Sequence, residues 1–175
     1  MAFRYKSNPH NALYSLANYQ CEVIADKLKA GSLEGITLDS MSAVIAMAFF
    51  TEALVNYVGA QRVHGWKERE KSPIKLQQIA KAIGVKLDIH VEPFATIVKL
   101  REVRNAMAHG QPTVRTIQPA NKVELTRMMR TPWGEAVEPE KVLAMYDQLK
   151  AFRSLVFTKA GIHPLLATDS AMGGF

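Results

Sequence analysis

The sequence alternates between stretches in which hydrophobic residues recur every three to four positions and short stretches rich in Pro, Gly and polar residues. A spacing of three to four residues places side chains on one face of an α-helix. Pro stands at the start of several of these stretches and Gly at their end, as expected at helix boundaries. The pattern predicts helices over residues 9–29, 39–58, 73–83, 93–109 and 139–159.

The helix predicted over 39–58 is hydrophobic on nearly every side, which is typical of the central helix of a bundle. Two later segments, 113–117 and 122–128, have β-branched or alternating character and predict a small β-hairpin before the last helix. Residues 166–175 are expected to form a loose tail. We therefore expect an all-α protein, an antiparallel bundle of four to five helices in a single domain over residues 1–165.

Composition narrows the class of protein. The chain has 175 residues, of which 48% are hydrophobic, enough for one continuous core. A net charge of +6 favours anionic partners, although the basic residues are spread along the chain. Cys21 is the single cysteine, and the N-terminus lacks the hydrophobic run of a signal peptide. The longest hydrophobic run, 43–50, is too short to span a bilayer, so we expect a cytoplasmic protein with no membrane partner.

The helix predicted over 93–109 has hydrophobic residues on two sides, which indicates two different contacts. One side is expected to face the core and carries Leu100, Val103 and Met107. The other side is expected to meet a second copy of the chain and carries Phe94, Ile97 and Ala108. Pairing of this helix with its counterpart about a twofold axis would make a homodimer.

Polar side chains border the second of these surfaces. Arg101 and Asn105 lie within it, and Arg104 and His109 flank it about 140° apart around the helix axis. Arg offers a planar, permanently charged fork to phosphate oxygens, and His exchanges protons near neutral pH. Because the 2′-hydroxyl of RNA can attack its own neighbouring phosphate, these groups suit RNA cleavage without a metal.

The run over residues 100–110, Leu-Arg-Glu-Val-Arg-Asn-Ala-Met-Ala-His-Gly, resembles the signature of the HEPN family of helical nucleases and nucleic-acid-associated proteins. In that signature an Arg, usually followed by a polar residue, precedes a His by a few positions. Arg104, Asn105 and His109 match this pattern. The preceding hydrophobic helix is also similar to the long helix of the family, so the resemblance covers about residues 39–110.

The resemblance implies an antiparallel bundle that dimerises through its motif helices and, in many relatives, cleaves RNA within toxin–antitoxin or phage-defence systems. We interpret Arg104, His109 and Asn105 as catalytic residues and Arg101 as a substrate-binding residue. RNA is the expected substrate, and an antitoxin protein is a further expected partner. A second interpretation keeps the fold and the dimer but makes the chain a non-catalytic module that binds RNA or a protein. A third makes it the nucleotide-modified partner of a nucleotidyltransferase.

Each of these residues also has a structural explanation. Arg104 and His109 lie near a helix C-terminus, where the helix dipole stabilises cations. Glu52 lies in the middle of a hydrophobic helix, where an unpaired carboxylate is costly to bury, so we expect an ion pair with Arg101 or Arg104. The remaining histidines and Cys21 show no metal-ligand spacing, so we expect neither a metal nor a cofactor.

Overall fold

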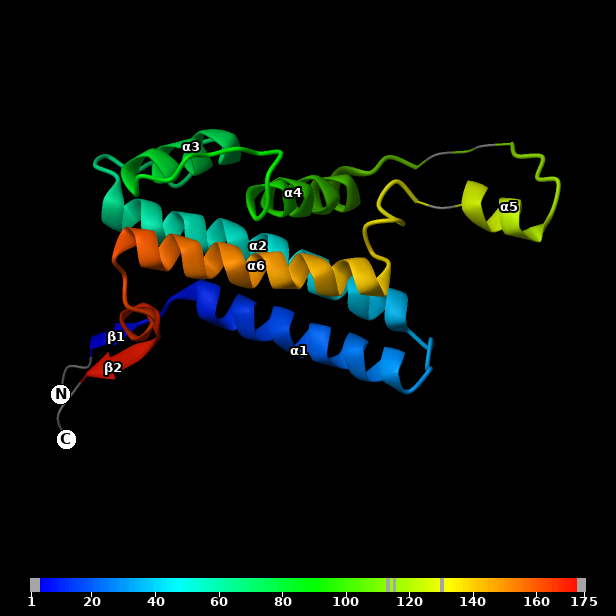
Figure 1. Cartoon of the computed structure of the whole chain (residues 1–175), viewed down its shortest axis with the longest axis horizontal. Coiled ribbons are helices and arrows are strands. Elements are labelled where there is room, and N and C mark those ends of the chain that lie inside the picture. Colours follow the sequence, from blue (N-terminus) through cyan, green and yellow to red (C-terminus); the bar gives the residue numbers. More distant parts are fainter. Residues whose placement is uncertain (1–3, 113, 115, 130, 173–175) are drawn as a thin grey trace.

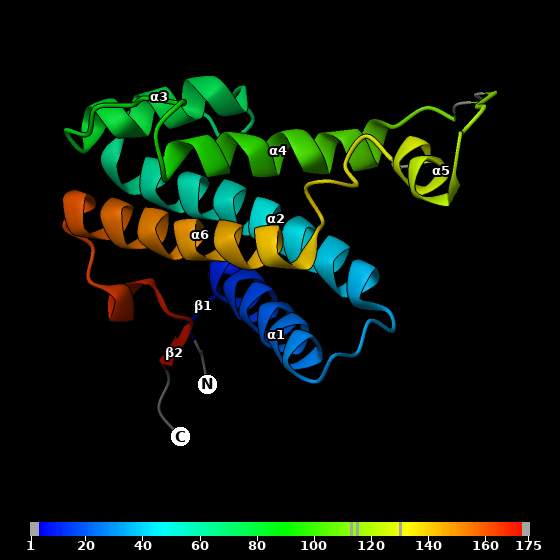
Figure 2. The same cartoon turned by 45° about the vertical axis from the view of Figure 1, so that its right-hand side comes forward.

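Five helices of the computed structural model form three layers and confirm the all-α class. Helices α2, Ile36–Arg62, and α6, Pro139–Ala160, lie side by side in the middle layer (Figures 1 and 2). Helix α1, Pro9–Lys29, covers one side of that layer, while α3, Ser72–Ala82, and α4, Phe94–His109, cover the other. The structure describes residues 4–112, 114, 116–129 and 131–172.

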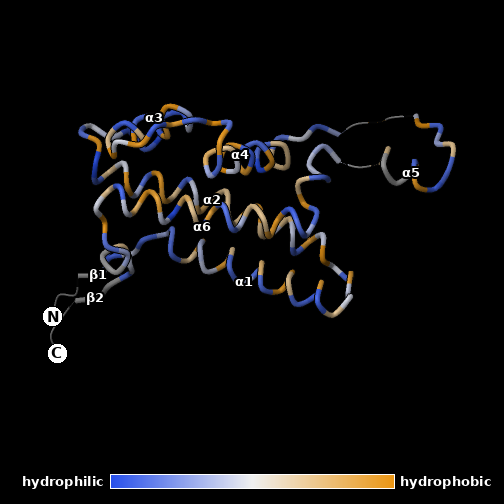
Figure 3. The backbone as a smooth tube through the Cα atoms, viewed as in Figure 1, coloured by the Kyte–Doolittle hydropathy of each residue, from blue (hydrophilic) through white to orange (hydrophobic). Residues whose placement is uncertain are grey.

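Helix α2 is central because its hydrophobic residues occupy nearly every side. Met47, Phe50 and Leu54 are fully buried, and hydrophobic positions recur along α2 and α6 in Figure 3. Burial of each such side chain contributes roughly 1.5–3 kcal/mol. By length and composition alone α2 is also apolar enough to cross a membrane, but 61% of its most apolar window is buried inside the bundle. Such burial is typical of a core helix.

The end of α2 differs from the prediction at Gly59. The sequence suggests a helix end there, but the helix continues to Arg62. Gly59 is instead a site of close approach, because a Cβ at this position would overlap the indole of Trp66. The helix is then fixed at its end by Arg62, whose Nε donates a hydrogen bond of 2.6 Å to the carbonyl of Ala160 on α6.

The predicted hairpin is wrong, because residues 122–128 form helix α5, Lys122–Met128. The Asn121 carboxamide oxygen accepts from the Glu124 N–H at 2.9 Å, and the Glu124 carboxylate accepts from the Ala120 N–H at 2.8 Å. This reciprocal arrangement resembles a capping box and stabilises the start of a helix. In the first expected strand the described residues 114, 116 and 117 form no strand, and 113 and 115 lie outside the described residues. Helix α5 stands away from the bundle (Figures 1 and 2).

The expectation of a loose C-terminal tail is also wrong for residues 166–172. Strand β2, Ser170–Met172, pairs antiparallel with strand β1, Arg4–Lys6. Asn8 joins the two ends of the chain, since its backbone N–H donates to Asp169 Oδ1 at 2.6 Å and its side-chain amide donates to the Thr168 carbonyl at 2.8 Å. Residues 173–175 of the expected tail lie outside the described residues.

Candidate functional site

Helix α4 presents its predicted core face to α2 and α6. Leu100 and Val103 are buried, and the half-buried Met107 packs against the same core. These positions confirm the predicted orientation of the helix. The helix begins after Pro93 and ends at His109, one residue before Gly110. The orientation of this helix decides which of the remaining side chains reach solvent.

Two of the residues predicted to form the dimer surface lie in the core instead. Phe94 is 6% exposed and Ile97 is 5% exposed. The ring of Phe94 packs edge-on against Phe152 of α6, with ring centroids 5.9 Å apart. The prediction that these two side chains form a free surface is wrong, because α6 and α3 supply neighbours that the helix by itself does not reveal. Ala108 is exposed, as predicted.

The outward face of α4 carries most of the predicted site. Asn105, Ala108 and His109 are exposed, and Arg101 is half-buried beside them. Neither Asn105 nor His109 forms a hydrogen bond or ion pair with the part of the chain that the structure describes. Their polar groups are therefore free to contact another molecule.

Arg104 has a different environment, because its guanidinium lies against α2. Its Nη2 is 3.0 Å from Glu52 Oε2, and its side chain is 25% exposed. The guanidinium carbon also lies 5.5 Å from the ring centroid of Phe49, which is 43% exposed. The predicted ion pair of Glu52 with Arg104 is confirmed, whereas Arg101 is not its partner. Glu52 and Phe49 thus fix the direction of the Arg104 side chain.

Lys75 on α3 approaches Glu52 from the opposite side and was not predicted from the sequence. Its Nζ is 3.7 Å from Glu52 Oε1 and donates hydrogen bonds of 3.0 Å to Asn56 Oδ1 and to the Glu68 carbonyl. The residue is only 2% exposed, and a buried ammonium requires such partners. One signal was present, since Lys75 falls on the same helix face as the buried Leu76 and Ile79.

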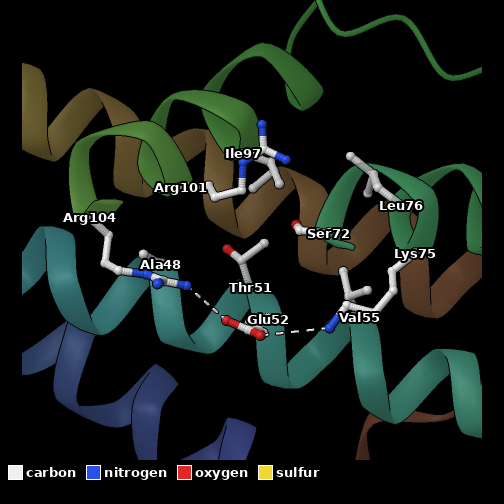
Figure 4. A pocket seen from close by; sticks show the side chains of 10 residues that line it. All are labelled: Ala48, Thr51, Glu52, Val55, Ser72, Lys75, Leu76, Ile97, Arg101 and Arg104. Atoms are coloured by element: carbon white, nitrogen blue, oxygen red, sulfur yellow. Dashed lines mark hydrogen bonds and ion pairs between the residues drawn. The ribbon is translucent and has the colours of Figure 1, made fainter. Parts of the chain in front are cut away.

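The space between α2, α3 and α4 is a pocket with charged and apolar sides. Figure 4 shows Arg104 and Lys75 flanking Glu52 at one end, while the guanidinium of Arg101 lies at the other end, beyond Thr51. Its apolar side is formed by Ala48, Val55, Leu76 and Ile97. Arg101 forms no hydrogen bond or ion pair with the described residues. It is the cation of this pocket that is free to bind an anion.

One chain does not bring Arg104 and His109 to the same point. The two residues are separated by about 140° around the helix and by roughly 7.5 Å along its axis. Arg104 is directed to Glu52, whereas His109 is exposed at the helix end. Gly110 follows in an extended conformation, and a Cβ there would lie 2.8 Å from the Ala106 carbonyl oxygen and 3.4 Å from the Trp133 ring. This close approach of the chain to the Ala106 carbonyl therefore favours glycine at position 110.

Metal ligands are not grouped in this region. Among the described residues, no three His, Cys, Asp or Glu side chains are placed to share a metal ion. What the site offers is therefore a fixed guanidinium, a free guanidinium, a free imidazole and a free amide. Comparison of the chain with protein-family models, with curated proteins and with solved structures finds no match.

Proposed function

We propose that this chain is a metal-independent endoribonuclease of the HEPN type, acting in the cytoplasm as a homodimer with a composite Arg and His site. The observation that carries the proposal is the division of the site within one chain. Glu52 and Phe49 hold Arg104 on one side of α4, while Asn105 and His109 are exposed on another. Each chain then supplies half of a catalytic site.

A second copy of the chain completes the site if its α4 lies antiparallel to the first about a twofold axis. An arrangement that places Arg104 opposite the partner subunit's His109 also places Asn105 opposite the partner subunit's Ala108. The small side chain at position 108 permits a close approach of the two helices. Phe49, which is 43% exposed beside Arg104, adds apolar area to this contact. Phe49 thus supplies the apolar contact that was predicted for Phe94 and Ile97, which are buried in the core.

The chemistry needs only the 2′-hydroxyl of RNA and these side chains. The partner subunit's His109 accepts the 2′-hydroxyl proton as that oxygen attacks the neighbouring phosphorus, and the imidazolium so formed returns this proton to the departing 5′-oxygen. Arg104 stabilises the negative charge that builds on the non-bridging oxygens. Asn105 positions the imidazole or the phosphate through its amide. The products are a 2′,3′-cyclic phosphate and a free 5′-hydroxyl.

One observation favours a second candidate function, a non-catalytic module that binds RNA or a protein such as an antitoxin. The ion pair with Glu52 already occupies one side of the Arg104 guanidinium. A guanidinium engaged in this way has less charge to offer a transition state. A binding module would use the same outward face of α4 without cleaving its ligand.

Incubation of the purified protein with single-stranded RNA in excess chelator separates the two functions. The nuclease proposal expects cleavage with 2′,3′-cyclic phosphate ends, detected by mass spectrometry, and loss of cleavage in Arg104→Ala. An oligonucleotide with 2′-deoxyribose throughout is the matched control, since it lacks the nucleophile and must stay intact. If the RNA is bound but not cut, the nuclease proposal is rejected in favour of the binding module. Cleavage that requires a divalent ion would reject the metal-free mechanism.

A further inference from the structure

The pocket between α2, α3 and α4 contains one cation, Arg101, that is not paired within the part of the chain that the structure describes. Arg104 and Lys75 both face Glu52, so the carboxylate at that end is compensated from two sides. Arg101 at the other end forms no hydrogen bond or ion pair with the described residues (Figure 4). The charged lining comprises three cations and one carboxylate, which leaves a formal charge of +2.

The end of the pocket near Arg101 suits a phosphate group. A guanidinium binds two phosphate oxygens with paired N–H donors. Ser72, at the start of α3, contributes a hydroxyl to the same lining. Lys75 has its donors directed to Asn56, Glu68 and Glu52, so its contribution is a fixed positive charge rather than a direct contact.

The apolar side of the pocket is too closed to admit a nucleotide ring, since the cavity has a volume of about 30 Å³. Ala48, Val55, Leu76 and Ile97 form this side and offer no hydrogen-bonding side-chain group. Each of these four side chains is only 5–6% exposed. The sugar and base of a bound nucleotide therefore remain outside the pocket while the phosphate lies at Arg101.

We propose that the pocket is a subsite for a phosphate of the RNA strand next to the bond that is cleaved. Arg101 binds that phosphate, and the attached sugar and base lie outside the pocket. Arg101 precedes Arg104 by three residues, roughly 4.5 Å along the helix axis, so one strand can follow α4 from the subsite to the catalytic Arg. The choice of RNA as the ligand rests on the proposed function, whereas the binding of a phosphate rests on the pocket alone.

Binding is measured with a fluorescent single-stranded RNA that carries 2′-O-methyl groups and so cannot be cleaved. Arg101→Gln should weaken binding about tenfold, as expected for the loss of one charge-assisted phosphate contact. The slope of log affinity against log salt should fall by about 0.7, the value for one phosphate contact on a single strand. Arg101→Lys, which keeps the charge but loses the fork, should lie between Arg101→Gln and the unchanged protein.

Lys99→Gln is the matched control. Lys99 is exposed on the same helix but lines a different pocket. Its replacement by Gln removes the same formal charge as Arg101→Gln. Its affinity should stay within about twofold of the unchanged protein, as expected for a substitution away from the contact. Glu52→Gln removes the only carboxylate of the α2–α3–α4 pocket lining and should tighten binding. Equal losses in Arg101→Gln and Lys99→Gln would overturn the subsite, because they would reflect net charge alone.

Competition identifies the source of the phosphate. Unlabelled RNA should displace the probe at far lower concentration than either a nucleoside 5′-monophosphate or inorganic phosphate. If the monophosphate competes as well as RNA, the pocket is a free-nucleotide site and the strand subsite is rejected. The two proposals fail separately. If the protein does not cleave RNA but Arg101→Gln still binds RNA more weakly, only the nuclease proposal is rejected. If the protein cleaves RNA and Arg101→Gln binds RNA as well as the unchanged protein, only the subsite is rejected.

Discussion

Replacement of Arg104 by Ala should reduce cleavage far more than it reduces stability. The side chain has two interactions that the structure defines. Its ion pair with the half-exposed Glu52 is worth roughly 0.5 kcal/mol. Its contact with the partly exposed ring of Phe49 adds roughly 0.5–1 kcal/mol. The free energy of unfolding should therefore fall by only about 1 kcal/mol, and the variant should fold.

The loss of a preorganised positive charge at a transition state is larger. Removal of one such group costs about 2.7–4 kcal/mol in activation free energy, or roughly a hundredfold to a thousandfold in rate. Urea unfolding and RNA cleavage, measured on the same preparation, give the two quantities. Lys99→Ala serves as the control for a lost cation on α4. Cleavage reduced only in proportion to unfolded protein, or a free energy of unfolding reduced by more than about 3 kcal/mol, would make Arg104 a structural residue.

Four further outcomes follow from individual side chains. His109→Ala should change stability by no more than about 0.5 kcal/mol but slow cleavage at least about a hundredfold, and normal cleavage would remove it from the mechanism. Ala108→Glu should fold but be monomeric in light scattering, while a persistent dimer would place the interface elsewhere. Burial, aided by the positive charge of Arg153, lowers the pKa of His10. The unfolded chain then takes up this proton at a higher pH than the folded chain, so the free energy of unfolding should fall as pH drops below about 6.5, less so in His10→Gln. Burial raises the pKa of Cys21 to about 12, so iodoacetamide at pH near 8 should modify it only after denaturation, and rapid labelling of folded protein would contradict its burial.

Helix positions could be predicted because local chemistry sets them. Pro9 and Pro139 begin α1 and α6 where a first turn needs no amide proton, and Gly161 ends α6 in the left-handed conformation with a φ of 61°. The core side of α4 was likewise predictable from helical spacing. The ion pair of Glu52 with Arg104 was predictable too, because a carboxylate within a hydrophobic helix requires a partner.

The features that could not be predicted depend on contacts with residues that are distant in the sequence. Phe94 was expected to be exposed, since nothing in α4 indicates that Phe152 covers it. Lys75 resembles a surface lysine until Asn56 and the Glu68 carbonyl are placed around its ammonium. The strands at the two chain ends are three residues each, too short for an alternating pattern to be recognised.

The hairpin prediction failed for a local reason. Alternating hydrophobic residues over 122–128 favoured a strand, but Asn121 and Glu124 form the hydrogen bonds that begin a helix. An Asn followed three residues later by Glu is a helix-start signal that the sequence did contain. Capping chemistry therefore outweighed hydropathy in this short segment.

A mixing experiment with two inactive variants tests the composite site most directly. A mixed dimer contains one Arg104→Ala chain and one His109→Ala chain. Its Arg104 comes from the His109→Ala chain, and its His109 comes from the Arg104→Ala chain. Random reassociation of equal amounts makes about half of the dimers mixed, and each mixed dimer retains one Arg and His pair across the interface. We expect that cleavage, absent from either variant alone, returns on mixing. No recovery, with light scattering showing that the mixed dimers form, would contradict a site shared between two subunits.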